Sequence, residues 1–392
     1  MTWLERLAGR HGYSVDVIRT LHKVYGYELE PVLHALKSPG RFYHLRVNTL
    51  KTSRGKVLDS LREKGVEAEP HPLLPDTIRI PIEGPNTLPE AEKTIVVDKF
   101  TAESALMGAN VYVPGVKDCR GLRRGDLVAV ADEVGEVVAV GVSKMSEKEV
   151  LSRRKGLVVE NTHPLYSLPP VRELSEYRNG LVYPQSCPSI LAVHVLNPKP
   201  GETLVDLTCA PGGKLSHAYQ LMRGEGEIIG VDRSRKKIAQ TRRTLSRLGF
   251  HRVKLLSADS RYLDVDYGWI RADKCIVDPP CSALGVMPKL YEQKTRGQIL
   301  SLADYQRQFL KVAAKIVRSG GRILYSVCTM TIEECEENAR FAVEKLGLRL
   351  ERGGPFLGSH GIVRELWGAE ETQRFHPHLH DAGYYIALFR KP

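Results

Sequence analysis

The stretch VDLTCAPGGKLSHAYQLM, residues 205–222, has the pattern of a strand, a glycine turn and a helix. Downstream of it, short apolar runs alternate with helical patterns such as LADYQRQFLKVAAKIVRSG, residues 302–320. This alternation is typical of βαβ units, which form a parallel sheet with helices on both faces. The expected strands are TLVDLTC, EIIGVD, RVKLLSA, KCIVDPP and RILYSVC. The predicted fold class is therefore α/β, with ligands bound beyond the carboxyl ends of the strands.

The turn after the first strand has the features of a nucleoside site. Gly212 and Gly213 let the backbone approach a ligand closely, and the helix N-terminus offers free N–H groups. Asp232 follows nineteen residues after Gly213 and ends the second strand, where an acidic residue can hold ribose hydroxyls. Asp259 ends the third strand, where an adenine would lie. The alternative is a tight turn with two aspartates that cap helices.

The phosphate-binding patterns of dinucleotide and nucleotide sites are absent from this stretch. It contains neither G-x-G-x-x-G nor G-x-x-x-x-G-K-[ST], so no diphosphate cradle is expected. A nucleoside without a pyrophosphate fits better, and S-adenosylmethionine is the predicted cofactor.

Two cysteines follow two of the predicted strands directly. They are Cys281 in IVDPPCSALG, residues 276–285, and Cys328 in RILYSVCTMT, residues 322–331. The other five cysteines are expected to be small buried hydrophobes. No C-x-x-C pair occurs, so no metal site is expected. A disulfide between Cys281 and Cys328 stays open from sequence.

Two thiols beside a methyl donor fit one reaction well, the methylation of carbon 5 of cytosine. A thiolate that adds to carbon 6 makes carbon 5 nucleophilic, which is covalent catalysis. A second group must then remove the proton from carbon 5 so that the thiolate can leave. Asp278, three residues before Cys281, could donate a hydrogen bond to ring nitrogen 3 if a raised pKa keeps it protonated.

These motifs resemble the Sun (Nol/Nop/Sun) family of RNA cytosine-5 methyltransferases. The resemblance rests on VDPPCSALG, LYSVCTMTIEECEENA and DLTCAPGGK, and also on LRVNTLK and YPQSCPSILAVHVLNPKPGE. It departs from the family where D-x-C-A-A-P-G-G-K is usual, because the cysteine here is shifted by one residue. The later motif reads V-C-T-M where T-C-S is commoner.

The resemblance implies a role for each matched residue. Cys328 would be the nucleophile, and Cys281 would assist proton removal and product release. Asp278 would bind the cytosine edge, with Lys214 also within reach of the base. The cofactor would be held by Thr208, Cys209, Ala210, Pro211, Gly212, Gly213, Lys214, Asp232, Asp259 and Asp278.

Two other readings of this domain stay open. Methyltransferases of exocyclic amines also use D-P-P, but an aromatic residue normally follows, and here Cys281 follows. A catalytically inactive RNA-binding assembly factor would not need S-adenosylmethionine, so a titration with it separates the two classes. Methylation of rRNA is the alternative within the family.

Residues 93–165 differ in character, with valine-rich alternating segments that predict short strands. The segments GANVYVPGV and GDLVAV resemble a PUA domain, a small β-barrel found on RNA-modifying enzymes. Arg120, Arg123 and Arg124 are its candidate RNA-binding residues, or else a solvated turn. A PUA domain in this place implies the branch that methylates tRNA at cytosine 72, near the CCA end of the acceptor stem.

The predicted organisation has three parts. Residues 1–92 would form an α+β RNA-binding region, residues 93–165 the PUA domain, and residues 166–392 a class I, Rossmann-like methyltransferase domain. The net charge is +11, and ten basic residues lie within 233–261, which favours a nucleic-acid partner. No run of eighteen apolar residues and no secretory leader occur, so we expect a cytoplasmic protein that does not enter membranes. We also expect a monomer.

Overall fold

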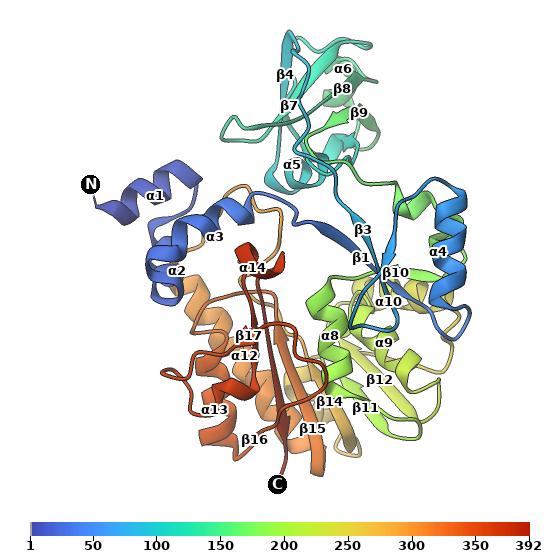
Figure 1. The fold of residues 1–392 in the computed structure, drawn as a ribbon, viewed down its shortest axis with the longest axis vertical. Helices are drawn as coiled ribbons and strands as arrows, with labels where there is room; N and C mark the ends of the chain where they lie inside the picture. The colour runs from blue at the N-terminus through green and yellow to red at the C-terminus, as the bar shows by residue number, and fades with distance from the viewer. Residues whose placement is uncertain (1) are drawn as a thin grey trace.

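The computed structural model describes residues 2–392 and contains three β-sheets. Figure 1 shows their arrangement, with the largest sheet and its helices in the lower part of the view. The N-terminal helices lie to the left of it, and the middle module, residues 93–165, stands at the top. Among the described residues, no helix combines the length and the apolar character that a membrane span requires.

The largest sheet has the strand order β13-β12-β11-β14-β15-β19-β18-β17, with β16 paired to β19. The strands from β13 to β15 are parallel, and the others pair antiparallel. The five expected strands are present as β11 (Thr203–Asp206), β12 (Glu227–Asp232), β13 (Lys254–Ser257), β14 (Ala272–Val277) and β15 (Val317–Val327). Beyond β15 the sheet continues with four further strands, which are β16 (Arg349–Leu350), β17 (Ser359–His360), β18 (Gln373–Phe375) and β19 (Tyr384–Arg390).

Helices cover both faces of this sheet because alternate strand residues point to opposite sides. On β14, Ile276 joins one core while Cys275 and Val277 join the other. The first face packs against α8 (Cys187–Leu196), α9 (Gly213–Leu221) and α10 (Arg235–Leu248). The second face packs against α11 (Leu263–Asp266), α12 (Arg296–Ile316) and α13 (Glu336–Leu346).

The strand order reverses between β11 and β14. From β11 the chain moves outward to β12 and β13, and it then returns to place β14 and β15 on the other side. The loops that follow β11 and β14 therefore separate and leave a crevice at the carboxyl edge. Both predicted cysteine motifs and the glycine turn lie at this edge.

The N-terminal region combines a helical subdomain with a small sheet. Its helices share a core with Leu284 and Met330, which lie just beyond the two cysteines. The sheet has the order β10-β1-β3-β2, so one strand comes from beyond the middle module. The predicted boundaries at 92 and 165 stay a prediction, since this sheet crosses them. The elements are α1 (Trp3–His11), α2 (Val15–Tyr25), α3 (Leu29–Leu36), β1 (Phe42–Val47), α4 (Arg54–Glu63), β2 (Glu69–Pro70), β3 (Thr77–Pro81) and β10 (Val182–Pro184).

The middle module is built from short strands, as the valine-rich pattern predicts. Its six strands have the order β5-β9-β8-β7-β4-β6 around a separate apolar core. Leu290, from the loop after Cys281, inserts into that core. The elements are β4 (Lys93–Val97), α5 (Lys99–Ala105), β5 (Val111–Tyr112), β6 (Val116–Asp118), β7 (Leu127–Ala131), β8 (Val137–Ser143), α6 (Glu147–Ser152) and β9 (Leu157–Pro164).

Candidate active site

The two predicted cysteines meet at the crevice. Cys281 follows β14 and Cys328 follows β15, and their Sγ atoms are 3.3 Å apart. Both are half-buried, and both are free thiols, so the disulfide left open by the sequence is not formed. Parallel neighbouring strands bring their carboxyl ends to the same edge, which explains how residues 47 positions apart come into contact.

The environment makes the two thiols unequal. The hydrogen bond from Cys281 lowers the pKa of Cys328, although burial and the Asp278 carboxylate act in the opposite direction. The same hydrogen bond, together with burial, raises the pKa of Cys281. Cys328 is thus the sulfur more easily held as a thiolate, which is the nucleophilic form of cysteine.

Asp278 and Lys214 form an ion pair beside the cysteines. Lys214 Nζ lies 2.6 Å from Asp278 Oδ2, and Ser326 Oγ donates to Asp278 Oδ1 at 3.1 Å. Burial by itself would lower the pKa of Lys214, but the Asp278 carboxylate and Tyr384 raise it above its ordinary value. The pair therefore keeps a charged donor at the site. Thr208 Oγ1 accepts the backbone N–H of Asp278 at 3.2 Å and ties the loops after β11 and β14 together.

A cavity of about 300 Å³ lies on one side of the cysteine pair. Both cysteines line it, together with five of the residues expected to hold the cofactor: Thr208, Ala210, Asp232, Asp259 and Asp278. Tyr305 and Phe309 of α12 add an aromatic wall that the sequence analysis missed. Cys209, Pro211, Gly213 and Lys214 line a smaller adjoining cavity instead. A polar end, an acidic edge and an aromatic wall suit a charged nucleoside.

The turn that leads into α9 requires glycine at one position. Gly212 has φ 106°, and a Cβ there would lie 3.3 Å from Thr241 Cγ2. Cys209 is buried behind this turn, and burial raises its pKa, while its role in binding the cofactor stays a prediction. Asp206 lies beneath the turn, where it accepts the N–H of Thr208 at 3.0 Å, and burial raises its pKa to about 7.

The two aspartates expected to hold the cofactor differ in how many hydrogen bonds their carboxylates already accept. Asp232 accepts one backbone N–H, that of Ser234 at 2.8 Å. Asp259 caps a short helical turn and accepts hydrogen bonds from Nε and Nη2 of Arg261, which lower the pKa of the carboxyl group. The capping alternative therefore describes the local contacts of Asp259, although its side chain still lines the cavity. The sequence analysis counted Arg261 only among the basic residues of 233–261, with no role at the cofactor site.

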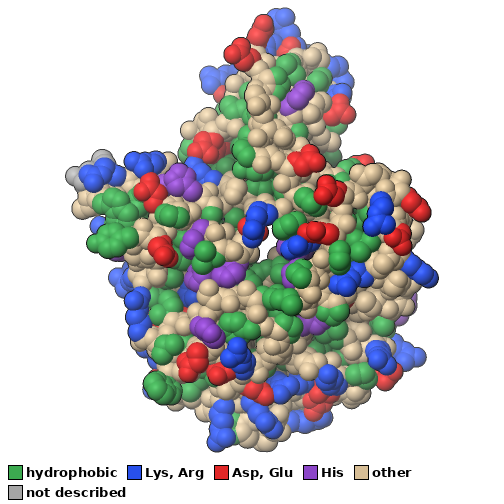
Figure 2. Space-filling model, viewed as in Figure 1, with side chains coloured by type: hydrophobic (Ala, Val, Ile, Leu, Met, Phe, Trp, Pro, Cys, Tyr) green, Lys and Arg blue, Asp and Glu red, His purple; other side chains and the backbone are tan. Residues whose placement is uncertain are grey.

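A second cavity, of about 340 Å³, lies on the other side of Cys328. Phe42 and His44 of β1 line it with Met107 of the middle module and Tyr384 of β19. Burial lowers the pKa of His44 to about 4, so the imidazole of His44 is uncharged at neutral pH. In Figure 2 the surface is hollowed where the three parts of the chain meet. Cys328 lines both cavities and so lies between them.

One group of side chains at this second cavity has the composition of a metal site. His44, His71 and Cys187 place their possible ligand atoms within 4.8 Å of one another. However, His71 Nδ1 accepts the N–H groups of Leu73 and Leu74, so its Nε2 carries a proton toward Cys187 Sγ at 3.5 Å. Hydrogen bonds therefore account for His71 and Cys187 in this group.

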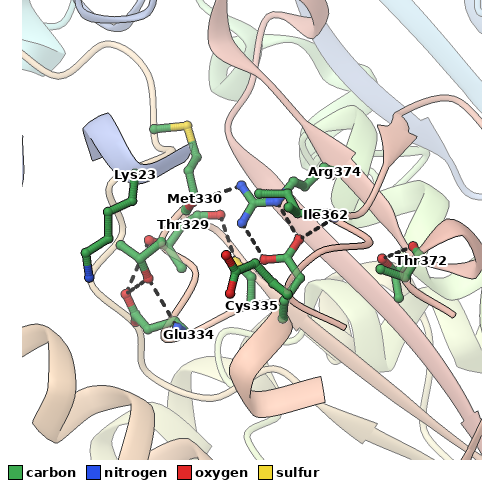
Figure 3. Close-up of polar contacts among 12 residues, drawn as sticks. Lys23, Thr329, Met330, Glu334, Cys335, Ile362, Thr372 and Arg374 are labelled. Carbon is green, nitrogen blue, oxygen red and sulfur yellow. Dashed lines mark hydrogen bonds and ion pairs between the residues drawn. The ribbon is translucent and has the colours of Figure 1, made fainter. Parts of the chain in front are cut away.

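Ionic contacts hold the loop that follows Cys328. Figure 3 shows the Arg374 side chain beside Met330. Arg374 donates to the Met330 carbonyl oxygen at 2.8 Å and forms a buried ion pair with Glu336. Lys23 of α2 pairs with Glu333 of the same loop at 2.7 Å. The loop is therefore fixed to both the edge strands and the N-terminal helices.

The three candidate RNA-binding arginines lie between β6 and β7 and line neither of the two cavities beside the cysteines. Arg120 is paired with Asp118 and Arg124 with Glu149, each at 2.7 Å. The exposed Arg123 side chain has no ion-pair or hydrogen-bond partner among residues 2–392. Their role in RNA binding stays a prediction.

Comparison with known proteins agrees with this geometry. Residues 193–390 match the family 16S rRNA methyltransferase RsmB/F, residues 93–165 match the PUA domain, and residues 17–85 match the ferredoxin-like domain of RsmF/B-like methyltransferases. The chain is 40% identical over 369 residues to a tRNA (cytosine(72)-C(5))-methyltransferase of Pyrococcus horikoshii, covering 93% of each chain. It is 30% identical to the tRNA (cytosine(72)-C(5))-methyltransferase NSUN6 of Mus musculus, over 89% of this chain and 82% of that protein. The crystal structure of NSun6 from Pyrococcus horikoshii with SFG superposes with a TM-score of 0.90 at 38% identity, covering 97% of this chain and 99% of that one.

Proposed function

Because the chain belongs to the 16S rRNA methyltransferase RsmB/F family, we propose that it is a tRNA cytosine-5 methyltransferase that uses S-adenosylmethionine. The observation that carries this proposal is the contact of Cys281 and Cys328 at 3.3 Å, between two cavities. One cavity suits a nucleoside cofactor, and the other opens toward the N-terminal region and the PUA domain. A base that enters from the RNA side reaches Cys328 directly.

The residues around the first cavity fit S-adenosylmethionine. The Asp232 carboxylate, which accepts one backbone N–H, can accept further hydrogen bonds from the ribose hydroxyls. Tyr305 and Phe309 offer an aromatic surface to the adenine. The turn from Thr208 to Lys214 and Asp278 would face the methionine part. When bound, the cofactor supplies an electrophilic methyl group. The relative solved with SFG, an analogue of S-adenosylmethionine, supports this assignment.

Cys328 would act as the nucleophile. Its lowered pKa favours the thiolate, whose sulfur adds to carbon 6 of the cytosine and leaves carbon 5 nucleophilic. Negative charge then builds toward ring nitrogen 3. The Lys214–Asp278 pair, at 2.6 Å, would donate there, so the donor proton comes from the pair rather than from a lone protonated Asp278.

Cys281 would complete the cycle. After methylation, the proton on carbon 5 must be removed while the bond from carbon 6 to Cys328 Sγ breaks. In this step Cys281 first releases its own proton to water. Its thiolate then takes the proton from carbon 5 as the bond from carbon 6 to Cys328 Sγ breaks, so Cys328 leaves as a thiolate and one proton is released to water for each methyl group transferred. The hydrogen-bonded pair of sulfurs is then restored.

A gel can test the roles of the two cysteines. Cys328→Ala should abolish methyl transfer and any covalent RNA adduct. Cys281→Ala keeps the nucleophile but lacks the group for release, so it should accumulate an adduct that survives denaturing electrophoresis. The opposite pattern would reverse the two assignments.

The target would be cytosine 72 of tRNA. Support comes from the relatives named for that position, one of them 40% identical over 93% of this chain, and from the PUA domain beside the second cavity. In this proposal the PUA domain holds the CCA end of the acceptor stem, and the enzyme acts as a cytoplasmic monomer. Bisulfite sequencing of total tRNA incubated with the protein and S-adenosylmethionine tests the site. Methylation found only at another tRNA position, or only in rRNA added in parallel, would refute the assignment. The Cys328→Ala variant is the negative control.

A further inference from the structure

A buried carboxylate joins the loops that carry the two cysteines. Glu334, which is fully buried, lies in the loop between Cys328 and α13. Its Oε1 accepts the backbone N–H of Ser282 and the side-chain amide of Gln306, each at 2.8 Å. Its Oε2 accepts the hydroxyl groups of Ser282, Thr329 and Thr331. We call these five residues the Glu334 cluster.

The cluster reaches each cysteine through its immediate neighbour in the chain. Ser282 follows Cys281, and Thr329 follows Cys328. Their hydroxyl oxygens are 2.6 Å apart, and both donate to the same carboxylate oxygen. Figure 3 shows Glu334 and Thr329 on this loop. The backbone of the two loops is thus fixed on one anchor, directly behind the sulfur pair.

Neighbouring basic residues do not neutralise this carboxylate. Lys23 pairs with Glu333, and Arg374 pairs with Glu336. Among residues 2–392, the contacts of Glu334 are hydrogen bonds from uncharged donors. A buried carboxylate is costly unless it is fully hydrogen-bonded, so all five donors are held to it tightly. An arrangement of this kind resists small shifts of either loop.

We infer that Glu334 is a positioning residue that sets the separation between the Cys281 and Cys328 sulfurs, an inference that rests on the proposed function. Addition to carbon 6 needs Cys328 alone, whereas release needs Cys281 placed against the adduct formed by Cys328. Loosening the two loops therefore slows release more than addition. The signature is an accumulated adduct with both cysteines present, which a general loss of stability does not produce.

The test compares Glu334→Gln with Glu176→Gln. Glutamine keeps the volume but turns one acceptor oxygen into a donor, so the three hydroxyls that converge on Oε2 lose their common acceptor. We expect release to slow about tenfold or more, since a displacement of about 1 Å can cost a hundredfold in rate. Adduct on a denaturing gel should rise relative to methylated product. Glu176 is also buried, but it pairs with Lys64 and accepts the hydroxyl of Ser60 on α4, so its variant should unfold at lower temperature without accumulating adduct.

A second pair of variants guards against misfolding of Glu334→Gln. Thr329→Val removes the hydroxyl beside Cys328 at constant volume, and Thr329→Ser retains it. Valine should accumulate adduct, and serine should restore the wild-type ratio of adduct to product. Wild-type ratios in both Glu334→Gln and Thr329→Val would overturn the inference. Wild-type enzyme that methylates no tRNA cytosine would instead refute the proposed function, and Cys281→Ala provides the reference amount of adduct.

Discussion

Gly383 donates its backbone N–H to the carbonyl oxygen of Gly285 at 2.9 Å, and Gly285 in turn donates to the carbonyl oxygen of Cys328 at 3.1 Å. The backbones approach so closely that a Cβ on Gly383 would lie 2.5 Å from Gly285 Cα. The loops after Cys281 and Cys328 and the segment before β19 are therefore joined by main-chain contacts. Glycine is required here for space, because its neighbours leave no room for a methyl group.

We predict that Gly383→Ala destabilises the protein and impairs the site. Overpacking typically costs about 1–3 kcal/mol, and the atoms that must move here belong to the backbone. Urea unfolding measures the change in the free energy of unfolding. Gly55→Ala in α4 is the matched control, because nothing lies within 4 Å of its added Cβ. It should gain up to about 1 kcal/mol from helix propensity, and a Gly383→Ala variant as stable as wild type would contradict the close approach.

The unequal thiols predict a pH dependence. The pKa of Cys328 is lowered mainly by the hydrogen bond from Cys281, so its thiolate persists to a lower pH than that of an ordinary cysteine. Removing the donor in Cys281→Ala should raise this pKa and move the rate of adduct formation to higher pH. Cys281→Ser retains an O–H donor and should keep the profile close to the wild-type one. Single-turnover adduct formation between about pH 5.5 and 9.5 spans the ordinary thiol pKa, and superimposable profiles for the alanine and serine variants would contradict the assignment.

Asp232 should contribute strongly to cofactor affinity. Asp232→Ala removes a charged acceptor from the ribose hydroxyls, and hydrogen bonds to a charged group contribute about 1.5–3 kcal/mol. Calorimetric titration with S-adenosylmethionine measures the loss. Asp59→Ala, on the exposed side of α4, is the control. Unchanged affinity in Asp232→Ala would remove this residue from the cofactor site.

Much of the catalytic domain could be predicted because its signals are local. Each strand is a short apolar run, and the carboxyl ends of parallel strands meet, so the contact of Cys281 with Cys328 follows from the pattern. Contacts that depend on the tertiary structure could not be predicted in this way. Glu334 gains its donors from four other residues, and Gln306 comes from α12, 28 positions earlier.

The sequence pattern also could not predict ion pairs at the surface. Arg124 meets Glu149 across 25 residues, which reduces the free positive charge of the loop that the sequence assigned to RNA. Likewise, β10 completes a sheet whose other strands precede the middle module, because the chain returns after that module to the edge of β1. Both features depend on where the folded chain returns to an earlier segment. The alternation of apolar and polar residues along the sequence does not predict these positions.

The last prediction concerns the RNA end. A cytosine in a stem must leave the stack before its carbon 6 can meet Cys328, and this costs a few kcal/mol, least at a frayed terminus. Contacts to the RNA backbone can hold the register without reading sequence. Arg123, exposed and without a side-chain partner among residues 2–392, is the arginine of this loop best placed to make one, whereas Arg120 and Arg124 must first leave their ion pairs.

We therefore expect Arg123→Ala to weaken tRNA binding more than Arg120→Ala, with affinity for S-adenosylmethionine unchanged in both. Filter binding and calorimetry measure the two affinities, and Arg62→Ala on α4, itself paired with Asp59, controls for the loss of a surface charge. Trimming the CCA tail should lower the methylation rate, and replacing all three loop arginines should add little to that loss, because both changes remove one contact. Additive losses would place the arginines elsewhere on the RNA, and a normal rate on CCA-less tRNA would show that the PUA domain does not hold the tail.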